Sequence, residues 1–379
     1  MGAVIIGYVR SPFHRAHKGA LAAVRPEDMA SQVIEQAIAQ SGVEIEDIED
    51  LMLGCAYPEG VQGLNLGRMV TYLSGLPSSV PGVTTNRLCG SSMQSIHDAT
   101  GAIAIGSGEV FLCGGVETMS LVKRGGWSRD LHPTIEADYP DAYINMGLTA
   151  ENLARSHSID RPRQEEFALR SHQKAASAKE SGFFDNELIS ISDDGISVSA
   201  DGCIRADTTL EMMASLSPAF LKDGSVTAAT SSPLTDGAAF TVICSEEYAE
   251  SRGIRPMARI ISTAVAGVPP DIMGIGPVPA SNKALARAGL NLDDIDVIEL
   301  NEAFSAQSLA VIDDLGVSDD DERLNIDGGA LAIGHPLGAS GARITGKAAS
   351  LLDRLGGEYA LASMCIGGGM GISTILQKI

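Results

Sequence analysis

The sequence predicts a layered α/β fold made of two similar halves with a segment inserted between them. Short apolar segments, such as 4–9 and 110–113, alternate with stretches in which apolar residues recur every three or four positions. A twelve-residue pattern at 42–53 returns at 289–300. The stretch 118–234 has a different texture, because it is polar, charged and irregular at its start. A duplicated α/β unit that received an insertion accounts for all three observations.

Length and charge limit the classes of function. The chain has 379 residues, more than a usual single domain, and its net charge of −21 argues against nonspecific binding of nucleic acid or anionic membrane. Its six cysteines are dispersed, without Cys-x-x-Cys or a Cys/His cluster at metal spacing, which favours a reducing, cytoplasmic location and no metal. Since no apolar run approaches the roughly 20 residues that span a bilayer, we expect no transmembrane segment.

The first half begins with a predicted strand over 4–9. A helix is expected from Pro26 to Gly42, because proline favours the first helical position and glycine the position after the last. A strand over 51–55 and a helix near 64–73 follow, before a short strand after Pro81.

The segment Asn86-Arg-Leu-Cys-Gly-Ser-Ser92 then places a cysteine where an apolar run breaks. The apolar spacing after it predicts a buried helix, so Cys89 lies at or just before a helix N-terminus, where free amide N–H groups favour a thiolate. Taken alone, the segment favours a buried core cysteine, since free cysteines are among the most buried residues.

The repeat supplies a partner for this cysteine. Gly42, Asp47, Ile48 and Leu53 are identical to the residues 247 positions later, namely Gly289, Asp294, Ile295 and Leu300. The same offset carries Cys89 to Pro336, beside His335. Leu-Cys-Gly-Gly at 112–115 also resembles Met-Cys-Ile-Gly-Gly at 364–368, which contains Cys365. We therefore expect equivalent loops in the two halves to carry Cys89 on one side and His335 and Cys365 on the other.

The insertion is expected to contain helices near 149–156 and over 162–182, the second capped by Asp160. A connection of this length with its own helices is a subdomain or lid. The predicted organisation is therefore an N-terminal half of residues 1–117 and 235–257, an insertion of residues 118–234, and a C-terminal half of residues 258–379.

Three glycine-rich loops could carry chemistry. They hold Cys89, His335 (within 328–341) and Cys365 (at the start of 365–371). A cysteine nucleophile needs a base, usually histidine, and the glycines after Cys365 pack little and can aim N–H groups at an oxyanion. Walker, nucleophile-elbow and dinucleotide-binding motifs are absent from the sequence.

Together these loops identify a family. Asn86–Met93, Asn301-Glu-Ala-Phe304, Gly334-His-Pro-Leu-Gly338 with Ser340-Gly341, and Cys365–Gly371 resemble, in order, the motifs of the thiolase family, in particular its bacterial 3-ketoacyl-CoA thiolases (acetyl-CoA C-acyltransferases). The resemblance covers essentially the whole chain. It implies the five-layered α-β-α-β-α thiolase fold, with residues 118–234 as a loop domain that covers coenzyme A.

The resemblance also implies roles. Cys89 would be the nucleophile, His335 its activator and Cys365 a second acid/base. Asn301 would hold a water in one oxyanion site, and the N–H groups of Cys89 and Gly367 would form the other. The implied reaction is thiolysis of 3-ketoacyl-CoA by CoA to acyl-CoA and acetyl-CoA in fatty-acid β-oxidation, through S-acyl-Cys89, with CoA as a co-substrate and no permanently bound cofactor.

Four further residues would contact CoA by the same resemblance: Ser232, Arg205, Met146 and Phe304. Ser232 could instead merely cap a turn, and Arg205 could be a solvated surface charge. Asn145 stands where short-chain biosynthetic thiolases often carry histidine, which favours the degradative branch.

Alternatives remain at this stage. An acetoacetyl-CoA thiolase condensing two acetyl-CoA molecules shares the motif after His335. A non-catalytic thiolase-like lipid- or acyl-CoA-binding protein is disfavoured because Cys89, His335 and Cys365 are all kept, and a ketoacyl synthase is disfavoured by Asn301 and the second cysteine. We expect a homodimer or homotetramer, while chain-length preference and a β-oxidation multienzyme partner subunit stay open.

Overall fold

One large mixed sheet runs through the molecule in the order β10-β11-β12-β9-β1-β8-β5-β3-β4, with the two-residue β2 (His14–Arg15) beside β8. The computed structural model describes residues 2–127 and 130–379. The N-terminal half supplies β1 (Ala3–Arg10), β3 (Ile48–Gly54), β4 (Gly82–Thr85), β5 (Val110–Thr118) and β8 (Thr235–Ser245). The C-terminal half supplies β9 (Ala258–Gly267), β10 (Val297–Leu300), β11 (Tyr359–Ile366) and β12 (Met370–Gln377).

The strand pairings confirm the duplication. In the first half β8 runs antiparallel to β1 and β5, and β3 runs parallel to β5. In the second half β12 runs antiparallel to β9 and β11, and β10 runs parallel to β11. The two sets of strands meet where β1 pairs with β9. Only the edge differs, because an isolated bridge between Ile298 and Leu324 stands where the first half has β4.

The repeated sequence pattern is the same local structure in both halves. Helices α1 (Pro26–Ser41) and α9 (Pro277–Ala288) end at Gly42 and Gly289, whose φ angles of 73° and 70° favour glycine. A short 3₁₀ turn, η1 (Ile45–Asp47) or η5 (Leu292–Asp294), then leads into β3 or β10. The predicted helix–turn–strand unit is therefore confirmed.

The expected match between the Cys113 and Cys365 loops is wrong. Leu53 pairs with Gly114 across β3 and β5, and its counterpart Leu300 pairs with Ser363 across β10 and β11. Since Cys365 lies two residues beyond Ser363, its structural counterpart is Val116. The similar segments around Cys113 and Cys365 therefore lie at different positions along their strands.

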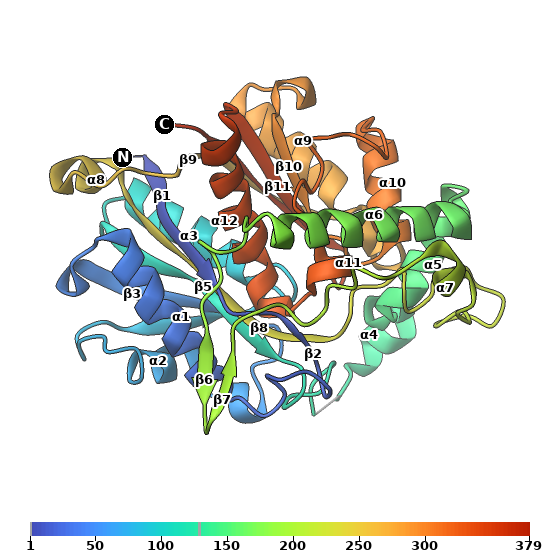
Figure 1. Cartoon of the computed structure of the whole chain (residues 1–379), viewed down its shortest axis with the longest axis horizontal. Helices are drawn as coiled ribbons and strands as arrows, with labels where there is room; N and C mark the ends of the chain where they lie inside the picture. The colour runs from blue at the N-terminus through green and yellow to red at the C-terminus, as the bar shows by residue number, and fades with distance from the viewer. Residues whose placement is uncertain (1, 128–129) are drawn as a thin grey trace.

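Two helices lie between the halves, α3 (Ser91–Ala104) and α12 (Leu337–Leu355) (Figure 1). They approach backbone to backbone, because a Cβ at Gly341 would lie only 2.4 Å from the Met93 nitrogen. Their buried residues form one core with residues of both sets of strands. Helix α1 covers the outer face of the first half, with α2 (Leu66–Thr71), and α9 and α10 (Ser305–Leu315) cover that of the second. These five layers confirm the predicted fold class.

The insertion is a subdomain fastened to the core. It contains α4 (Pro133–Asp138), η3 (Pro140–Tyr143), α5 (Met146–Ser156), α6 (Arg161–Glu180), α7 (Leu210–Ala214) and the hairpin of β6 (Ile191–Asp193) and β7 (Ile196–Val198). Helix α6 lies across the C-terminal half (Figure 1). Buried Arg10 pairs with Glu187 and Asp201, each at 2.7 Å, and ties the insertion to β1. The three domain boundaries themselves remain a prediction.

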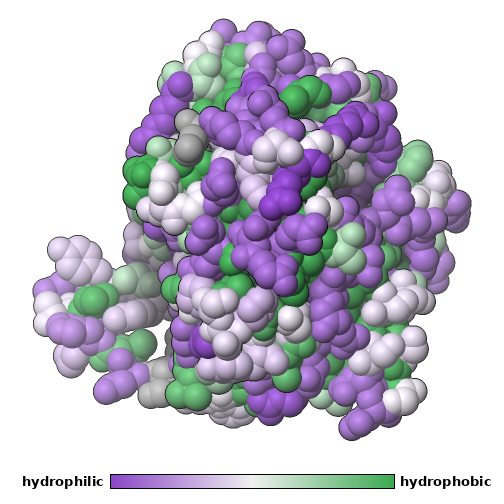
Figure 2. Space-filling model, turned by 90° about the vertical axis from the view of Figure 1, so that its left-hand side faces the viewer, coloured by the Kyte–Doolittle hydropathy of each residue, from purple (hydrophilic) through white to green (hydrophobic). Residues whose placement is uncertain are grey.

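One helix of the insertion differs from expectation. Helix α5 begins at Met146 rather than near 149, because the Asn145 side chain accepts a hydrogen bond from the Gly147 N–H at 2.9 Å and caps the helix three residues earlier. The remaining segments are η2 (Gly60–Gln62), α8 (Glu246–Arg252), η4 (Pro270–Ile275) and α11 (Ala330–Ile333). The face seen in Figure 2 is mostly hydrophilic, in keeping with the net charge. Among the described residues, no helix is both long and apolar enough for a bilayer span.

Candidate active site

Cys89 lies in the turn that enters α3, two residues before the helix begins, as predicted. The turn is held by its own polar side chains. Asn86 Oδ1 accepts from the Leu88 N–H at 2.8 Å, and Ser91 Oγ accepts from the Arg87 N–H at 3.0 Å. Leu88 has a φ of 46°, a left-handed conformation that costs energy in a non-glycine residue and that these bonds sustain. All six cysteines are among the described residues, and only Cys89 is partly exposed, so the interpretation as a core cysteine is wrong.

The expected thiolate at Cys89 is not favoured. Burial raises the pKa of the Cys89 thiol above its usual value. The N–H groups of Gly367 and of Cys89 itself, together with the charge of Arg124, act in the opposite direction but do not outweigh burial. At neutral pH the sulfur therefore carries its proton, and a base must remove it before attack.

His335, the base expected from the sequence, is held by hydrogen bonds on several sides. It lies between α11 and α12, with its backbone N–H donating to Thr235 Oγ1 at 3.0 Å. Its Nδ1 lies 2.5 Å from Ser340 Oγ, and its Nε2 lies 3.4 Å from Asn301 Nδ2. Burial, and then the charges of Arg343 and Arg124, lower the pKa of His335 to about 3. The imidazole is therefore neutral near pH 7 and free to accept a proton.

Cys365 is a buried core residue, contrary to the expectation that its glycines leave it little to pack against. It is the penultimate residue of β11, 1% exposed, and joins Phe304, Val226 and Ala303 in an apolar cluster. Burial, followed by the charge of Cys89, raises the pKa of the Cys365 thiol. This electrostatic coupling indicates that the two thiols share one site.

Asn301 and Gly367 complete the polar part of the site. Asn301 follows β10 and is buried; its Oδ1 has no hydrogen-bond partner among the described residues. Its neighbour Glu302 accepts from Ser171 Oγ at 2.6 Å, which joins this loop to the insertion. The Gly367 N–H faces the Cys89 sulfur, and a Cβ at Gly367 would lie 3.3 Å from both Leu88 and Met146. A side chain here would narrow the approach to Cys89.

Three of the four predicted CoA-contacting residues lie near these groups. Met146 and Phe304 belong to the apolar cluster around Cys365, where the Phe304 ring meets the Phe220 ring edge-on at 5.8 Å. The Ser232 N–H donates to the Ala303 carbonyl at 3.0 Å. The structure does not bring Arg205 into this cluster: the residue is exposed, and its backbone is held by a hydrogen bond from its N–H to His172 Nδ1 at 3.2 Å and by one from the Thr208 N–H to its carbonyl at 3.4 Å.

Sequence reasoning missed Glu117, a buried carboxylate that accepts a hydrogen bond from Gly338, three residues after His335, and whose charge raises the pKa of the Cys89 thiol. Its signal was a single carboxylate within the otherwise apolar and glycine-rich run Val110-Phe-Leu-Cys-Gly-Gly-Val-Glu117. Ser340 was noted only as part of a motif, although it holds His335. Within residues 2–127 and 130–379, no group of three or more His, Cys, Asp or Glu residues is arranged to hold a metal ion.

Comparison with known proteins matches two family models, one to each part of the chain. Residues 3–247 match the family model described as thiolase, N-terminal domain, and residues 254–378 match thiolase, C-terminal domain. The 3-ketoacyl-CoA thiolases of Serratia proteamaculans and Erwinia tasmaniensis are 45% and 46% identical, over 99% of each chain.

Solved structures agree with this comparison. Bacillus anthracis acetyl-CoA acetyltransferase superimposes with a TM-score of 0.91 at 40% identity, over 100% of this chain and 99% of that one. Human mitochondrial 3-ketoacyl-CoA thiolase in complex with CoA superimposes with a TM-score of 0.92 at 38% identity, over 100% and 98%.

Proposed function

The chain belongs to the thiolase family, and on that premise we propose that it cleaves 3-ketoacyl-CoA with CoA, giving acyl-CoA and acetyl-CoA in fatty-acid β-oxidation. The observation that carries the proposal is the site of Cys89. The one partly exposed cysteine lies against the Gly367 N–H and is coupled to the buried thiol of Cys365. Two sulfurs and an oxyanion donor thus meet where the two halves join.

In the first half-reaction His335 takes the proton from Cys89, and the sulfur attacks the 3-keto carbon. The bond between C2 and C3 breaks, and its electron pair passes into the acetyl-CoA enolate. Asn301 and protonated His335 would stabilise the enolate oxygen, while the N–H groups of Cys89 and Gly367 would hold the oxyanion formed at C3. The Cys365 thiol then protonates C2, and acetyl-CoA leaves.

In the second half-reaction the Cys365 thiolate takes the proton of the incoming CoA thiol. The CoA sulfur attacks the S-acyl group, acyl-CoA leaves, and the Cys89 sulfur recovers its proton from His335. The raised pKa of Cys365 suits both tasks, because the group begins as a thiol and its thiolate is a strong base.

CoA enters this scheme as a substrate. Met146 and Phe304 would line the path of the thioester, Ser232 would contact the pantetheine, and Arg205 would reach the nucleotide only if its exposed side chain turns toward it. The 38% identity to a thiolase whose structure holds CoA supports this assignment.

Two experiments test the reaction. Mass spectrometry of enzyme mixed with 3-ketoacyl-CoA should detect S-acyl-Cys89, with ping-pong kinetics; sequential kinetics without an acyl-enzyme would contradict the proposal. The variant C365A should still acquire the acyl group but turn over about 10²- to 10⁴-fold more slowly, the usual cost of losing an acid/base group. Full steady-state activity of C365A would remove Cys365 from the mechanism.

A second candidate is the condensation of two acetyl-CoA molecules. It is favoured by the 40% identity to an acetyl-CoA acetyltransferase, whereas Asn145 favours the degradative branch. Thiolytic kcat/KM measured from four-carbon to sixteen-carbon 3-ketoacyl-CoAs separates the two. Activity confined to the four-carbon substrate would favour condensation.

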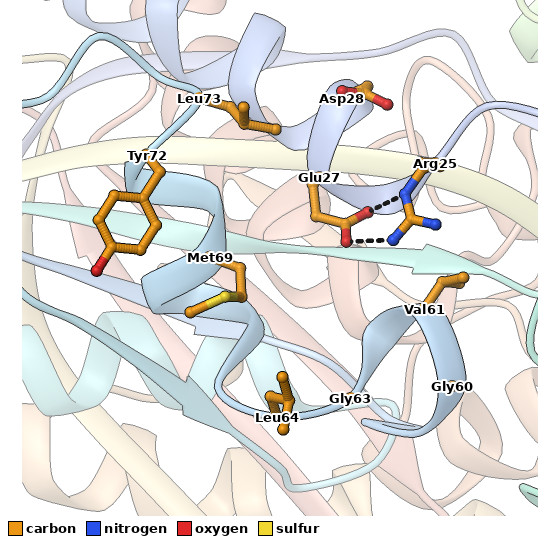
Figure 3. A pocket seen from close by; sticks show the side chains of 10 residues that line it. All are labelled: Arg25, Glu27, Asp28, Gly60, Val61, Gly63, Leu64, Met69, Tyr72 and Leu73. Atoms are coloured by element: carbon orange, nitrogen blue, oxygen red, sulfur yellow. Dashed lines mark hydrogen bonds and ion pairs between the residues drawn. The ribbon is translucent and has the colours of Figure 1, made fainter.

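We also propose a homodimer or homotetramer. Among the described residues, strand β4 ends the sheet with one edge unpaired. Exposed apolar residues lie on and around it, namely Leu64, Tyr72, Leu73 and Val83. Leu64, Tyr72 and Leu73 line a pocket between α1, η2 and α2 (Figure 3). Light scattering should give a mass above one chain, reduced in the V83K variant. A cytoplasmic location and a β-oxidation partner subunit are part of the same proposal, to be checked by fractionation and co-purification.

A further inference from the structure

Equivalent positions in the two halves hold chemically opposite side chains. The register that aligns Gly114 with Ser363 also aligns Glu117 with Ile366, each three residues further along. Both side chains cross to the helix of the other half. A Cβ at Gly90, the residue before α3, would lie 2.5 Å from Ile366 Cδ1, and Glu117 accepts from the Gly338 N–H in the first turn of α12.

Glu117 is surrounded by donors. Its side chain is 1% exposed and accepts from four N–H groups: Ala56 N at 2.8 Å, Tyr57 N at 3.3 Å, Gln62 Nε2 at 2.7 Å and Gly338 N at 2.9 Å. An ionised carboxylate accepts and never donates, so it suits this environment better than any neutral side chain of its size.

The bond to Gly338 caps α12. The N–H groups of a first helical turn lack partners within the helix, and Pro336, which precedes α12, offers no side-chain cap. Glu117, 221 residues away in sequence, supplies one from the opposite half. The contact leaves little room for movement, because a Cβ at Gly115 would lie 2.1 Å from the Gly338 carbonyl oxygen.

His335 depends on this same turn. It lies three residues before Gly338, and its Nδ1 partner Ser340 lies two residues after. We propose that Glu117 is a positioning residue: a carboxylate from one half that caps α12 and thereby holds the His335 imidazole of the other half in place for Cys89. The inference rests on the proposed function, since it gives His335 a role as base.

Its charge gives Glu117 a second, measurable effect. Two nearby charges act on the Cys89 thiol, those of Arg124 and Glu117, and Cys89 in turn acts on Tyr57 and Cys365. The negative charge of Glu117 raises the pKa of the Cys89 thiol. Positioning and charge therefore predict different results for variants that keep or lose the carboxylate.

The variant E117Q keeps the size but turns an NH₂ group toward four donors. We expect kcat to fall about 10- to 100-fold, the scale of a misplaced catalytic group, with KM within about twofold. Alkylation of Cys89 by iodoacetamide should shift to lower pH, because the opposing charge is gone. The variant E117D keeps the charge but shortens the reach, so kcat should fall similarly while the alkylation profile stays at its wild-type pH.

The matched control is D327N. Asp327 is another buried carboxylate facing α12, but it accepts from Arg354 and pairs with Lys347, further along the helix. D327N should lower the melting temperature and leave the alkylation profile unchanged. Folded E117Q and E117D with wild-type kcat, or an equal shift of the profile in D327N, would overturn the inference. The alkylation of Cys89 needs no substrate. A wild-type protein without thiolase activity would therefore refute the proposed function, while the alkylation profiles would still test the effect of Glu117 on Cys89.

Discussion

The N-termini of α3 and α12 occupy the same place in the two halves and are equipped differently. The turn before α3 carries the partly exposed Cys89, no side chain caps the helix, and apolar Ile366 covers it. The turn before α12 carries His335, which is 4% exposed, and Glu117 caps that helix. In the proposed reaction the first terminus would serve the reacting sulfur and the oxyanion, while the second is capped by a carboxylate from the other half.

This difference shows how two copies of one structural unit can carry different groups at equivalent places. The duplicated strands bring the two helix ends together, and the different side chains at equivalent positions leave hydrogen-bond donors at one end and a carboxylate cap at the other. The pKa shifts match this division, since burial raises that of Cys89 and lowers that of His335. Both groups are therefore uncharged at rest, a thiol on one side and a neutral imidazole on the other.

Removing the nucleophile of α3 should have the largest effect. C89A is expected to lose at least about 10³-fold in kcat/KM, the scale seen when a covalent nucleophile is deleted. No acyl-enzyme should then be detected by mass spectrometry. C244A, which removes a buried cysteine on β8, is the control and should keep its activity. Retained thiolysis in C89A would place the chemistry elsewhere.

Making the two helix ends alike should have the next largest effect. I366E puts a carboxylate beside the N-terminus of α3, as Glu117 does at α12. We expect Cys89 alkylation to shift to higher pH and kcat to fall about 10²-fold, because negative charge opposes the thiolate and oxyanion. I366Q has the same size without the charge. An equal shift of the alkylation profile in I366Q would mean that packing, rather than charge, separates the two ends.

Replacing Arg343 tests the electrostatics at the N-terminus of α12, because its charge acts on His335. It lies within α12, pairs with Glu299 at 3.3 Å, and lowers the pKa of His335. R343M should raise that pKa, so the acidic limb of the pH–rate profile moves to higher pH while kcat at its optimum falls less than about tenfold. R354M, which removes an arginine near the end of the same helix, should destabilise the fold without moving the limb. If folded R343M kept the acidic limb at its wild-type pH, the assignment of that limb to His335 would be wrong.

The smallest effect concerns stability. On α3, His97 lies 2.8 Å from Thr374 Oγ1 of β12, and burial lowers its pKa to about 3. The unfolded histidine titrates near 6.5, so the unfolded chain binds more protons between these values. The free energy of unfolding should therefore fall as pH drops below about 6.5, by up to about 1.4 kcal/mol per pH unit for this group. Urea unfolding of H97Q should show a shallower pH dependence; an unchanged slope would be inconsistent with a half-buried, neutral His97.

Most local features followed from the sequence. Apolar periodicity, proline and glycine at helix ends, and the repeated 42–53 pattern predicted α1, α3 and the duplicated strands, because these signals act over a few residues. The start of α5 was misplaced since Asn145 was weighed as a family marker rather than as a cap. The motif order alone identified the thiolase family and the set of Cys89, His335, Cys365 and Asn301.

The tertiary structure decided how these residues behave. Burial, which no local pattern states, keeps Cys89 protonated and makes Cys365 a core residue rather than a loop residue. Register across the sheets made Val116 the counterpart of Cys365 and aligned Glu117 with Ile366. The hydrogen bond from Gly338 to Glu117 joins residues 221 positions apart. Sequence determines which groups are present and the local conformation around each, whereas desolvation and long-range contacts, which set pKa values and orientation, exist only once the two halves pack together.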